Sequence, residues 1–544
     1  MKSAFDTVVA QLRPVTSQFD PDAIATATAC LRRLRTLALR ESASLLAYHE
    51  CLLFLRAHPA DPVMLRLVEG EFARIAAFMR TRRGRHRALP GNEGLPFVST
   101  VTRYSHDCIR WLSHHPHCSV HFEEFAGATL DLDAVLRLTL PPLERSETGA
   151  GLANDELLEA LAVRPERRLA FLVAELSRLD HVPHVKDHLF DALGMMVRVT
   201  PTHAAFSTAF NRLPVAQPFF QTERVRQFDA SALMHSELPG ARVLQGADRE
   251  TVVQVIRDTM TLNGRETDPA TYLDDRSLRV FDLERGVSVA LFGMIPERQL
   301  ALESYVGFTA FKNGMPVSYG GAWMLGERAE FGMNIFEPYR GGESGYLMCQ
   351  LLRVYRQTFG LRYIEVDAHQ FGRDNPEGIA TGAFWFYYRY GFRPVEARIA
   401  ARATREKARL TAKPGARSTR TTLLALTESN VALSFGGAPP PTLYDISTRV
   451  TRMVARHYGG DRPAAERDCV DRFVAATSWS RTGDTHQSEV LAEMALIARA
   501  LRVTDPEGLG LLAGMVEAKP VDVYAYQRLL SAFLPRLRVT RSRS

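Results

Sequence analysis

The sequence has little cysteine, little lysine and no long hydrophobic run. Six scattered cysteines in 544 residues are too few for a disulfide-stapled scaffold and suit reduced thiols. No stretch approaches the ~20 consecutive apolar residues that cross a bilayer. The start, MKSAFDTVVAQLRP, also lacks the basic, apolar and small-residue segments of a signal peptide. We therefore expect a cytoplasmic protein that does not associate with membranes.

What is present is a composition close to the globular average, with 46% hydrophobic and 24% charged residues. At ~150 residues per domain, the length predicts roughly three to four domains. Because there are only six lysines, arginine supplies 61 of the 67 cationic residues. Arginine suits phosphate and carboxylate recognition, but a bias spread over the whole chain locates no site.

Helical periodicity dominates the first part of the chain. Leu45, Tyr48, Leu52 and Leu55 form an apolar stripe that resumes after the breaker at 58–62, which predicts a helical hairpin. We expect residues 1–235 to form an all-helical N-terminal region.

The apolar period becomes two after Pro239-Gly240. Strands are predicted at 287–292, 305–311, 317–323, 329–336 and 363–368, with a helix at 346–359 that implies a βαβ unit. The Gly/Pro-rich segment 436–441 predicts a boundary, and 442–544 again have helical periodicity. The predicted fold class is α+β, with a mixed sheet at 240–435 between an all-helical N-terminal region and a helical C-terminal region.

The most informative segment is a glycine-rich turn, Arg340-Gly341-Gly342-Glu343-Ser344-Gly345, between a predicted strand and a predicted helix. Glycines there leave backbone N–H groups bare beside a helix N-terminus, which stabilises anions, and Arg340 adds a positive charge. The turn therefore indicates a phosphate site. The alternative is a tight connection whose glycines only permit positive φ or close packing.

A second motif, Phe-Trp-Phe-Tyr-Tyr-Arg-Tyr-Gly-Phe from Phe384 to Phe392, follows the strand predicted at 363–368. The order of hairpin, strand, glycine-rich turn, helix, strand and aromatic helix resembles the GNAT superfamily of acyl-CoA-dependent N-acyltransferases. The resemblance covers residues 240–435, and its motifs fall within 329–393.

The resemblance implies a GNAT-like sheet, acetyl-CoA or another acyl-CoA as co-substrate, and no metal. It places the donor pyrophosphate on the turn, through Arg340, Gly341, Gly342, Ser344 and Gly345. Tyr387 matches the family tyrosine that protonates the departing thiolate. A phenol keeps its proton at neutral pH, so it suits a general acid.

Glu343 departs from the family turn, R/Q-x-x-G-x-G/A. Counting from Arg340 puts Glu343 at a glycine position, and counting from Tyr339 loses the initial cation. A carboxylate ~4 Å from a phosphate charge costs about 1 kcal/mol in water and about 4 kcal/mol at an effective dielectric near 20. We expect Glu343 either to point away from the donor or to weaken its binding.

Such a transferase also needs a base that takes a proton from the amine. The candidates are Glu330, Glu337, Glu365, Asp367 and His369, and strand alternation puts the last three on one side. Glu330 and Asp367 are the first choices. The alternative for each of these residues is an ordinary surface group that is solvated or ion-paired.

Two other signals compete with this assignment. The segment 106–121 is rich in His and Cys but lacks paired metal-ligand spacing, and His184 and His188 stand four apart, so an ordinary structural role is favoured over zinc for both. No metal site is predicted. Basic stretches at 80–87 and 402–420 are interpreted as solvated faces rather than nucleic-acid surfaces.

The leading hypothesis is an N-acyltransferase that moves an acyl group, first of all acetyl, from a CoA thioester to an amine on a small molecule or a protein. One alternative is a catalytically silent scaffold that binds protein partners through its helical regions. Another is a transferase that takes its donor from an acyl-carrier protein or an aminoacyl-tRNA. The acceptor, the acyl chain length and the oligomeric state do not follow from the sequence.

Overall fold

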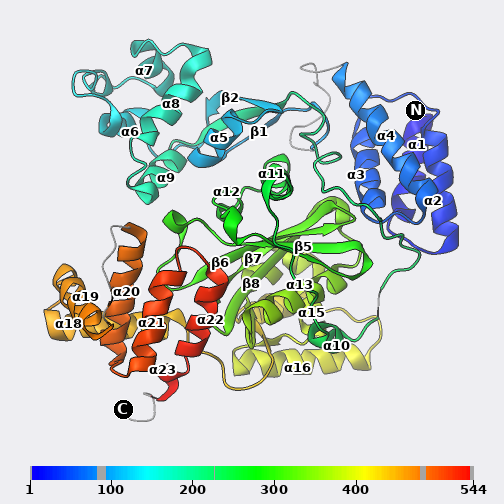
Figure 1. The fold of residues 1–544 in the computed structure, drawn as a ribbon. Helices are drawn as coiled ribbons and strands as arrows, with labels where there is room; N and C mark the ends of the chain where they lie inside the picture. Colours follow the sequence, from blue (N-terminus) through cyan, green and yellow to red (C-terminus); the bar gives the residue numbers. More distant parts are fainter. Residues whose placement is uncertain (1–2, 82–93, 226, 478, 480–484, 540–544) are drawn as a thin grey trace. The chain divides into compact units, whose positions relative to one another are not determined.

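The computed structural model describes residues 3–81, 94–225, 227–477, 479 and 485–539. The chain forms two compact units. The first comprises Met1–Glu223, Glu250–Thr271 and Asn313–Pro316, and the second comprises Arg224–Arg249, Tyr272–Lys312 and Val317–Ser544. Figure 1 gives the order of their elements along the chain. This division differs from the three regions expected from the sequence, since the third region falls in the same unit as most of the second.

Four helices open the first unit: α1 (Ala4–Val15), α2 (Pro21–Leu34), α3 (Ala43–Ala57) and α4 (Pro62–Arg80). Each follows a Ser or Asp whose side chain accepts a hydrogen bond from a backbone N–H of the first turn, which satisfies an otherwise unpaired donor. The hairpin predicted around residues 58–62 is confirmed by α3 and α4.

The N-terminal region is not all-helical, so that prediction was wrong. Residues Thr100–Thr102 (β1), Cys118–Phe125 (β2) and Met195–Pro201 (β3) form an antiparallel sheet in the order β1-β3-β2. In β3, Met195, Val197 and Val199 are buried and alternate with half-buried residues. This period-two pattern spans only seven residues between helices, and the helical periodicity on either side hid it.

Five of the helices described in the first unit pack their apolar sides into one core with this sheet, around Ile109, Leu136, Leu172 and Val197. They are α5 (His106–Ser113), α6 (Leu132–Thr139), α7 (Asn154–Ala160), α8 (Arg168–Ser177) and α9 (Pro183–Ala192), with 3-10 turns η1 (Glu147–Gly149) and η2 (Pro165–Arg167). Most of α11 (Gly246–Leu262) and α12 (Asp268–Thr271) also belong to this unit, and α11 adds Leu262 to the core.

An eight-stranded sheet is the centre of the second unit, in the order β10-β11-β9-β8-β7-β6-β5-β4. The strands are β4 (Arg279–Asp282), β5 (Val287–Phe292), β6 (Ser304–Lys312), β7 (Met315–Leu325), β8 (Arg328–Ile335), β9 (Tyr363–Val366), β10 (Arg393–Pro394) and β11 (Val431–Ser434). β8 pairs with β9 in parallel, whereas β7–β8 and β9–β11 are antiparallel. The mixed α+β class and the predicted βαβ unit are therefore confirmed.

Helix α13 (Ser344–Phe359) connects β8 to β9 and packs on one face of this sheet. Its Tyr355 ring lies 5.6 Å from Phe331 of β8, and its hydroxyl donates a 2.7 Å hydrogen bond to the carbonyl of Val306 in β6. Phe308 and Phe331 stack at 6.0 Å beneath it. These contacts fix the C-terminal half of α13 on the sheet, and its start follows the glycine-rich turn after β8.

The remaining helices of the second unit fall into two groups. Those before residue 430 are α10 (Ala230–His235), α14 (Pro376–Thr381), α15 (Ala383–Arg389), α16 (Ala397–Ala412) and α17 (Arg420–Leu426), with 3-10 turns η3 (Asp275–Ser277), η4 (Glu284–Gly286), η5 (Pro296–Arg298), η6 (Glu337–Tyr339) and η7 (Ala368–Phe371). Those after it are α18 (Leu443–Tyr458), α19 (Arg462–Thr477), α20 (Thr485–Leu501), α21 (Pro506–Ala518), α22 (Val523–Phe533) and α23 (Arg536–Val539).

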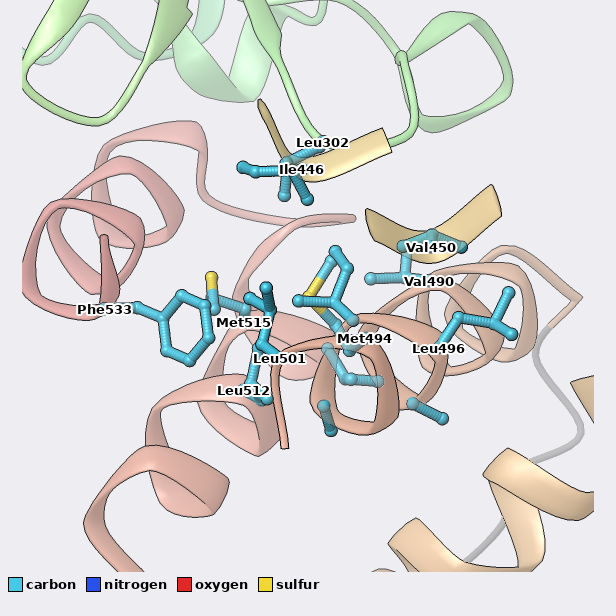
Figure 2. Packing of buried hydrophobic residues seen from close by; sticks show 14 of the residues in the cluster. Leu302, Ile446, Val450, Val490, Met494, Leu496, Leu501, Leu512, Met515 and Phe533 are labelled. Carbon is cyan, nitrogen blue, oxygen red and sulfur yellow. The ribbon is translucent and has the colours of Figure 1, made fainter. Parts of the chain in front are cut away.

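The helices α18–α23 confirm the helical C-terminal region, but their core is shared with the sheet. Figure 2 shows Met494, Leu512 and Phe533 packed together, with Leu302 in the same cluster of buried side chains. The carbonyl of Leu302 also accepts a 2.6 Å hydrogen bond from the hydroxyl of Tyr526. The C-terminal helices are thus part of one packed unit with the strands.

All six cysteines are buried free thiols. Among the described residues, no helix combines the length and the apolar character that crossing a membrane requires. Of the basic stretch at 80–87, Arg80 at the end of α4 and Thr81 lie within the described residues, and the rest lies outside them.

Candidate functional site

The glycine-rich turn lies between η6 and α13, directly after β8. Gly341 has a φ of 89°, a conformation that strains any residue with a side chain. No side chain of the described residues caps the first turn of α13, so no capping oxygen compensates the partial positive charge at its start. A free helix start after such a turn is suited to an anion.

The side chain of Glu343 is buried within the second unit. Its side chain is only 5% exposed and forms an ion pair with Arg285 at 2.9 Å. Lys312 Nζ lies 3.6 Å from the same carboxylate, and the backbone N–H of Val225 donates to it at 2.8 Å. Because two cations flank the carboxylate, its charge is neutralised within the protein.

Arg340 is held at the surface by two carboxylates. Its guanidinium pairs with Glu377 at 2.5 Å and lies 3.8 Å from Glu337. All three side chains are exposed, and exposed ion pairs contribute only about 0–1 kcal/mol. An incoming phosphate can therefore compete for Arg340 at little cost.

Gly345 meets the aromatic helix α15 at the first turn of α13. A Cβ atom at Gly345 would lie 1.7 Å from the hydroxyl oxygen of Tyr390, so only glycine fits beneath this ring. Tyr390 in turn stacks with Phe228 at 5.9 Å. The sequence predicted Gly345 to be part of the donor turn, with close packing as the alternative, and the structure shows a close contact at this glycine.

The two parallel strands separate beyond a short paired segment. β8 and β9 pair only at Arg328–Tyr363, Ala329–Ile364 and Glu330–Glu365, and β8 then continues to Ile335 without β9. Beyond Glu330 the described register therefore pairs β8 with β7 but not with β9, and an extended chain with amide groups is the kind of ligand that adds to such a strand. Gln370 lies near this opening, since a Cβ at Gly332 would be 3.4 Å from its Nε2.

Tyr387 on α15 is buried among aromatic rings. Its ring centroid lies 5.6 Å from that of Phe392 and 6.1 Å from that of Phe371. Burial raises the pKa of the phenol above its ordinary value, so the hydroxyl keeps its proton at neutral pH.

Glu330 lies on β8 directly opposite Trp323 of β7. Glu330 is exposed at the surface of β8. The pKa of its carboxyl is nevertheless raised, first by the partial loss of water around it and then because Asp367, Glu365 and Glu303 add negative charge. A raised pKa makes a carboxylate a stronger base at neutral pH. Glu303, whose own pKa is raised by burial, is a member of this cluster that the sequence did not single out.

The other predicted bases have different surroundings. β9 ends at Val366, two residues before the predicted end, so Asp367 caps η7 and accepts a 2.8 Å hydrogen bond from the N–H of His369. His369 is exposed, and its Nδ1 lies 2.9 Å from the carbonyl of Arg373. Glu365 is buried and paired with Arg328 and Asn430. Glu337 is exposed beside Arg340.

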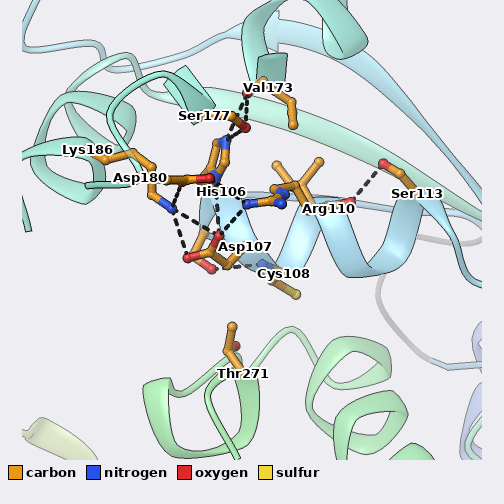
Figure 3. A network of polar contacts seen from close by, with 12 residues as sticks. His106, Asp107, Cys108, Arg110, Ser113, Val173, Ser177, Asp180, Lys186 and Thr271 are labelled. Carbon is orange, nitrogen blue, oxygen red and sulfur yellow. Dashed lines mark hydrogen bonds and ion pairs between the residues drawn. The ribbon is translucent and has the colours of Figure 1, made fainter. Parts of the chain in front are cut away.

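The segment 106–121 and its neighbours form a polar network in the first unit (Figure 3). His106, Asp107 and Asp180 come within metal-ligand distance of one another. Lys186 already occupies the place of a cation, with Nζ 3.0 Å from Asp107 and 2.7 Å from Asp180. Burial opposes ionisation, but hydrogen bonds from His106 and Lys186 lower the pKa of Asp107. The ammonium group of Lys186 thus neutralises Asp107 and Asp180 in the place where a metal ion would bind.

His115 is committed to structure in a similar way. Its Nδ1 accepts a hydrogen bond from the N–H of His117 at 3.1 Å, so the proton lies on Nε2, 3.1 Å from Asp258. Both nitrogens are used, which leaves none for a nucleophile or a metal.

The sequence assigned no role to Arg285, Lys312, Tyr390 or Gln370. Tyr390 belongs to the aromatic motif at 384–392, and Lys312, one of only six lysines in the chain, precedes the Asn-Gly turn. Arg285 and Gln370 had no distinguishing pattern. Comparisons with known protein families, characterised proteins and solved structures found no match to this chain.

Proposed function

We propose that the second unit is a GNAT-like N-acyltransferase that moves an acyl group from a CoA thioester to an amine. The observation that carries the proposal is the combination of a free, glycine-rich helix start on α13 with parallel strands that separate after three residue pairs. A donor with a pyrophosphate and an amide-bearing arm requires both features.

The turn would bind the pyrophosphate through the backbone of Gly341, Gly342, Ser344 and Gly345. Arg340 would leave its ion pair with Glu377 and pair with the pyrophosphate instead. Glu343 does not oppose this, because its carboxylate is buried against Arg285 and Lys312. The departure of Glu343 from the family turn, which favours a silent scaffold, is therefore compatible with donor binding as well.

In the proposed reaction the amine nitrogen attacks the thioester carbonyl, and the carbon–sulfur bond breaks. Glu330 would take the proton that the amine loses, and Asp367 would help by keeping the pKa of Glu330 high. Tyr387 would protonate the departing thiolate. Burial raises the pKa of a thiol as well as that of a phenol, so transfer between the two stays feasible in the same shielded surroundings.

Calorimetric titration with acetyl-CoA and longer acyl-CoAs tests the donor site directly. We expect saturable binding that Gly341→Ala weakens at least tenfold, because the φ of 89° strains alanine. Gly436→Ala is the matched control, since Gly436 also has a positive φ of 117° but has open space around it. Tyr387→Phe should leave binding intact and slow CoA release with an amine panel by about 10².

If none of the thioesters binds, the proposal is contradicted and the hypothesis of a silent scaffold is favoured instead. Equal loss in Gly341→Ala and Gly436→Ala would show that the turn does not hold the donor.

A further inference from the structure

Positive charge is concentrated in one segment of the second unit. Residues 397–420 hold eight cationic residues and a single carboxylate, Glu406, which gives a net charge of +7, whereas the whole chain has +6. The rest of the chain is therefore close to neutral. The cations are Arg398, Arg402, Arg405, Lys407, Arg409, Lys413, Arg417 and Arg420. An arginine bias spread over the whole chain does not account for this concentration.

The fold presents this charge to solvent. Helix α16 buries only Ile399 and Ala403, while Arg405, Lys407 and Arg409 are exposed. Figure 1 shows α16 as a yellow helix whose length follows the rim of the second unit. We call the exposed cations of 397–420 the α16 basic surface.

Little of this charge is neutralised internally. Glu406 is taken up by Arg409 and Ser418, and the hydrogen bond from Arg409 is the main reason that its pKa falls to about 2. Within the described residues, Arg405, Lys407, Lys413 and Arg420 have no ion-pair partner. Unpaired like charges repel one another, so a polyanion that neutralises them gains affinity from released counterions.

Aromatic side chains border the same surface. The indole N–H of Trp385 on α15 donates a 3.0 Å hydrogen bond to Ser418, within the basic segment. The neighbouring Tyr388 has the guanidinium of Arg393 over its ring at 3.9 Å. Both rings are only half-buried. A nucleic acid offers both phosphates for the cations and planar bases for the aromatic rings. An acidic protein offers the negative charge but no row of bases.

We propose that the α16 basic surface binds single-stranded nucleic acid. Phosphates lie along the cations of α16 and the loop after it, and a base stacks at Trp385, since Arg393 already covers the ring of Tyr388. This inference does not depend on the acyltransferase proposal, since binding is measured without a thioester.

The test is fluorescence anisotropy with a labelled 20-nucleotide RNA and a DNA of the same sequence, from 50 to 200 mM salt. We expect Arg405→Glu combined with Lys407→Glu to weaken binding at least tenfold. For single strands each phosphate contact contributes ~0.7 to the slope of log K against log salt, so the slope should fall by about 1.4. The matched control is Arg452→Glu with Arg456→Glu, an exposed pair on α18 with the same change in charge.

Retention of binding within threefold in the control supports the proposal, and the RNA and DNA arms identify which polymer is preferred. Three results overturn it: no binding of either oligonucleotide at 50 mM salt, equal loss in the two double variants, or binding of polyglutamate with neither oligonucleotide bound. Circular dichroism of the exposed-site variants confirms that they fold.

Discussion

Glu343 shows how one residue can carry opposite meanings in sequence and in structure. Beside a predicted phosphate site, its carboxylate suggests repulsion of the donor. In the fold it is buried between Arg285 and Lys312 and accepts a hydrogen bond from Val225. The residue therefore ties the turn to the hairpin and to the segment at 225, which makes it a structural anchor of the proposed donor site.

Glu343→Gln should destabilise the protein by ~3 kcal/mol, because it removes the buried carboxylate that pairs with Arg285 and lies beside the buried ammonium of Lys312. The measurement is the free energy of unfolding from urea titration. Glu377→Gln, which removes the partner of Arg340 in an exposed pair, serves as the control and should cost less than about 1 kcal/mol. Similar costs in the two variants would mean that Glu343 is not an anchor.

At the scale of elements, the contact between α13 and α15 should reverse the usual effect of a glycine-to-alanine substitution on the stability of a helix. Alanine in place of glycine normally stabilises a helix by about 1 kcal/mol. At Gly345 the new Cβ would overlap the phenol of Tyr390, so Gly345→Ala should instead destabilise the protein by about 2 kcal/mol and weaken donor binding.

A double-mutant cycle isolates this contact. In a Tyr390→Ala background the ring is gone, and Gly345→Ala should become neutral or stabilising in urea titration. Gly510→Ala, inside α21 with open space around it, provides the reference for an unhindered helix position. If Gly345→Ala costs the same with and without Tyr390, the ring contact is not the cause.

Elements with a long or strictly alternating pattern could be predicted from the sequence. The strand at Val287–Phe292 was predicted with the residues that the structure has, and the Asn313-Gly314 turn joins β6 to β7 as expected. The short strands β1 and β3 could not be predicted from the sequence, because helical periodicity surrounds them. Glu343 was beyond reach for another reason: its partners Arg285 and Lys312 approach only through the fold, and no spacing along the chain encodes that contact.

At the scale of the whole molecule, the C-terminal helices are joined to the sheet by buried polar groups as well as by apolar packing. Gln527 of α22 accepts a 2.9 Å hydrogen bond from the N–H of Gly326 and donates to the carbonyl of Met324. Lys519, after α21, donates to the carbonyls of Leu300 and Ala301. These bonds satisfy backbone groups at the sheet, so helices and strands should unfold together.

Lys519 makes this connection sensitive to pH. Its side chain is 3% exposed, and burial lowers its pKa to about 8, although Glu493 at 3.7 Å acts in the opposite direction. The unfolded chain keeps the ordinary lysine pKa near 10.4. Between about pH 8 and 10.4 the unfolded state therefore binds more protons, and the stability contributed at this site rises with pH.

Urea titration of wild type and Lys519→Met at pH 7.0 and 9.5 measures this effect. Below pH 8 the site contributes no pH dependence, because the lysine is protonated in both states. At pH 9.5 wild type should gain about 2 kcal/mol relative to Lys519→Met. The exposed Lys413→Met variant is the control and should follow wild type at both values. A difference between wild type and Lys519→Met that does not change with pH would mean that Lys519 keeps its ordinary pKa, and that the carbonyls of Leu300 and Ala301 with Glu493 fully compensate its burial.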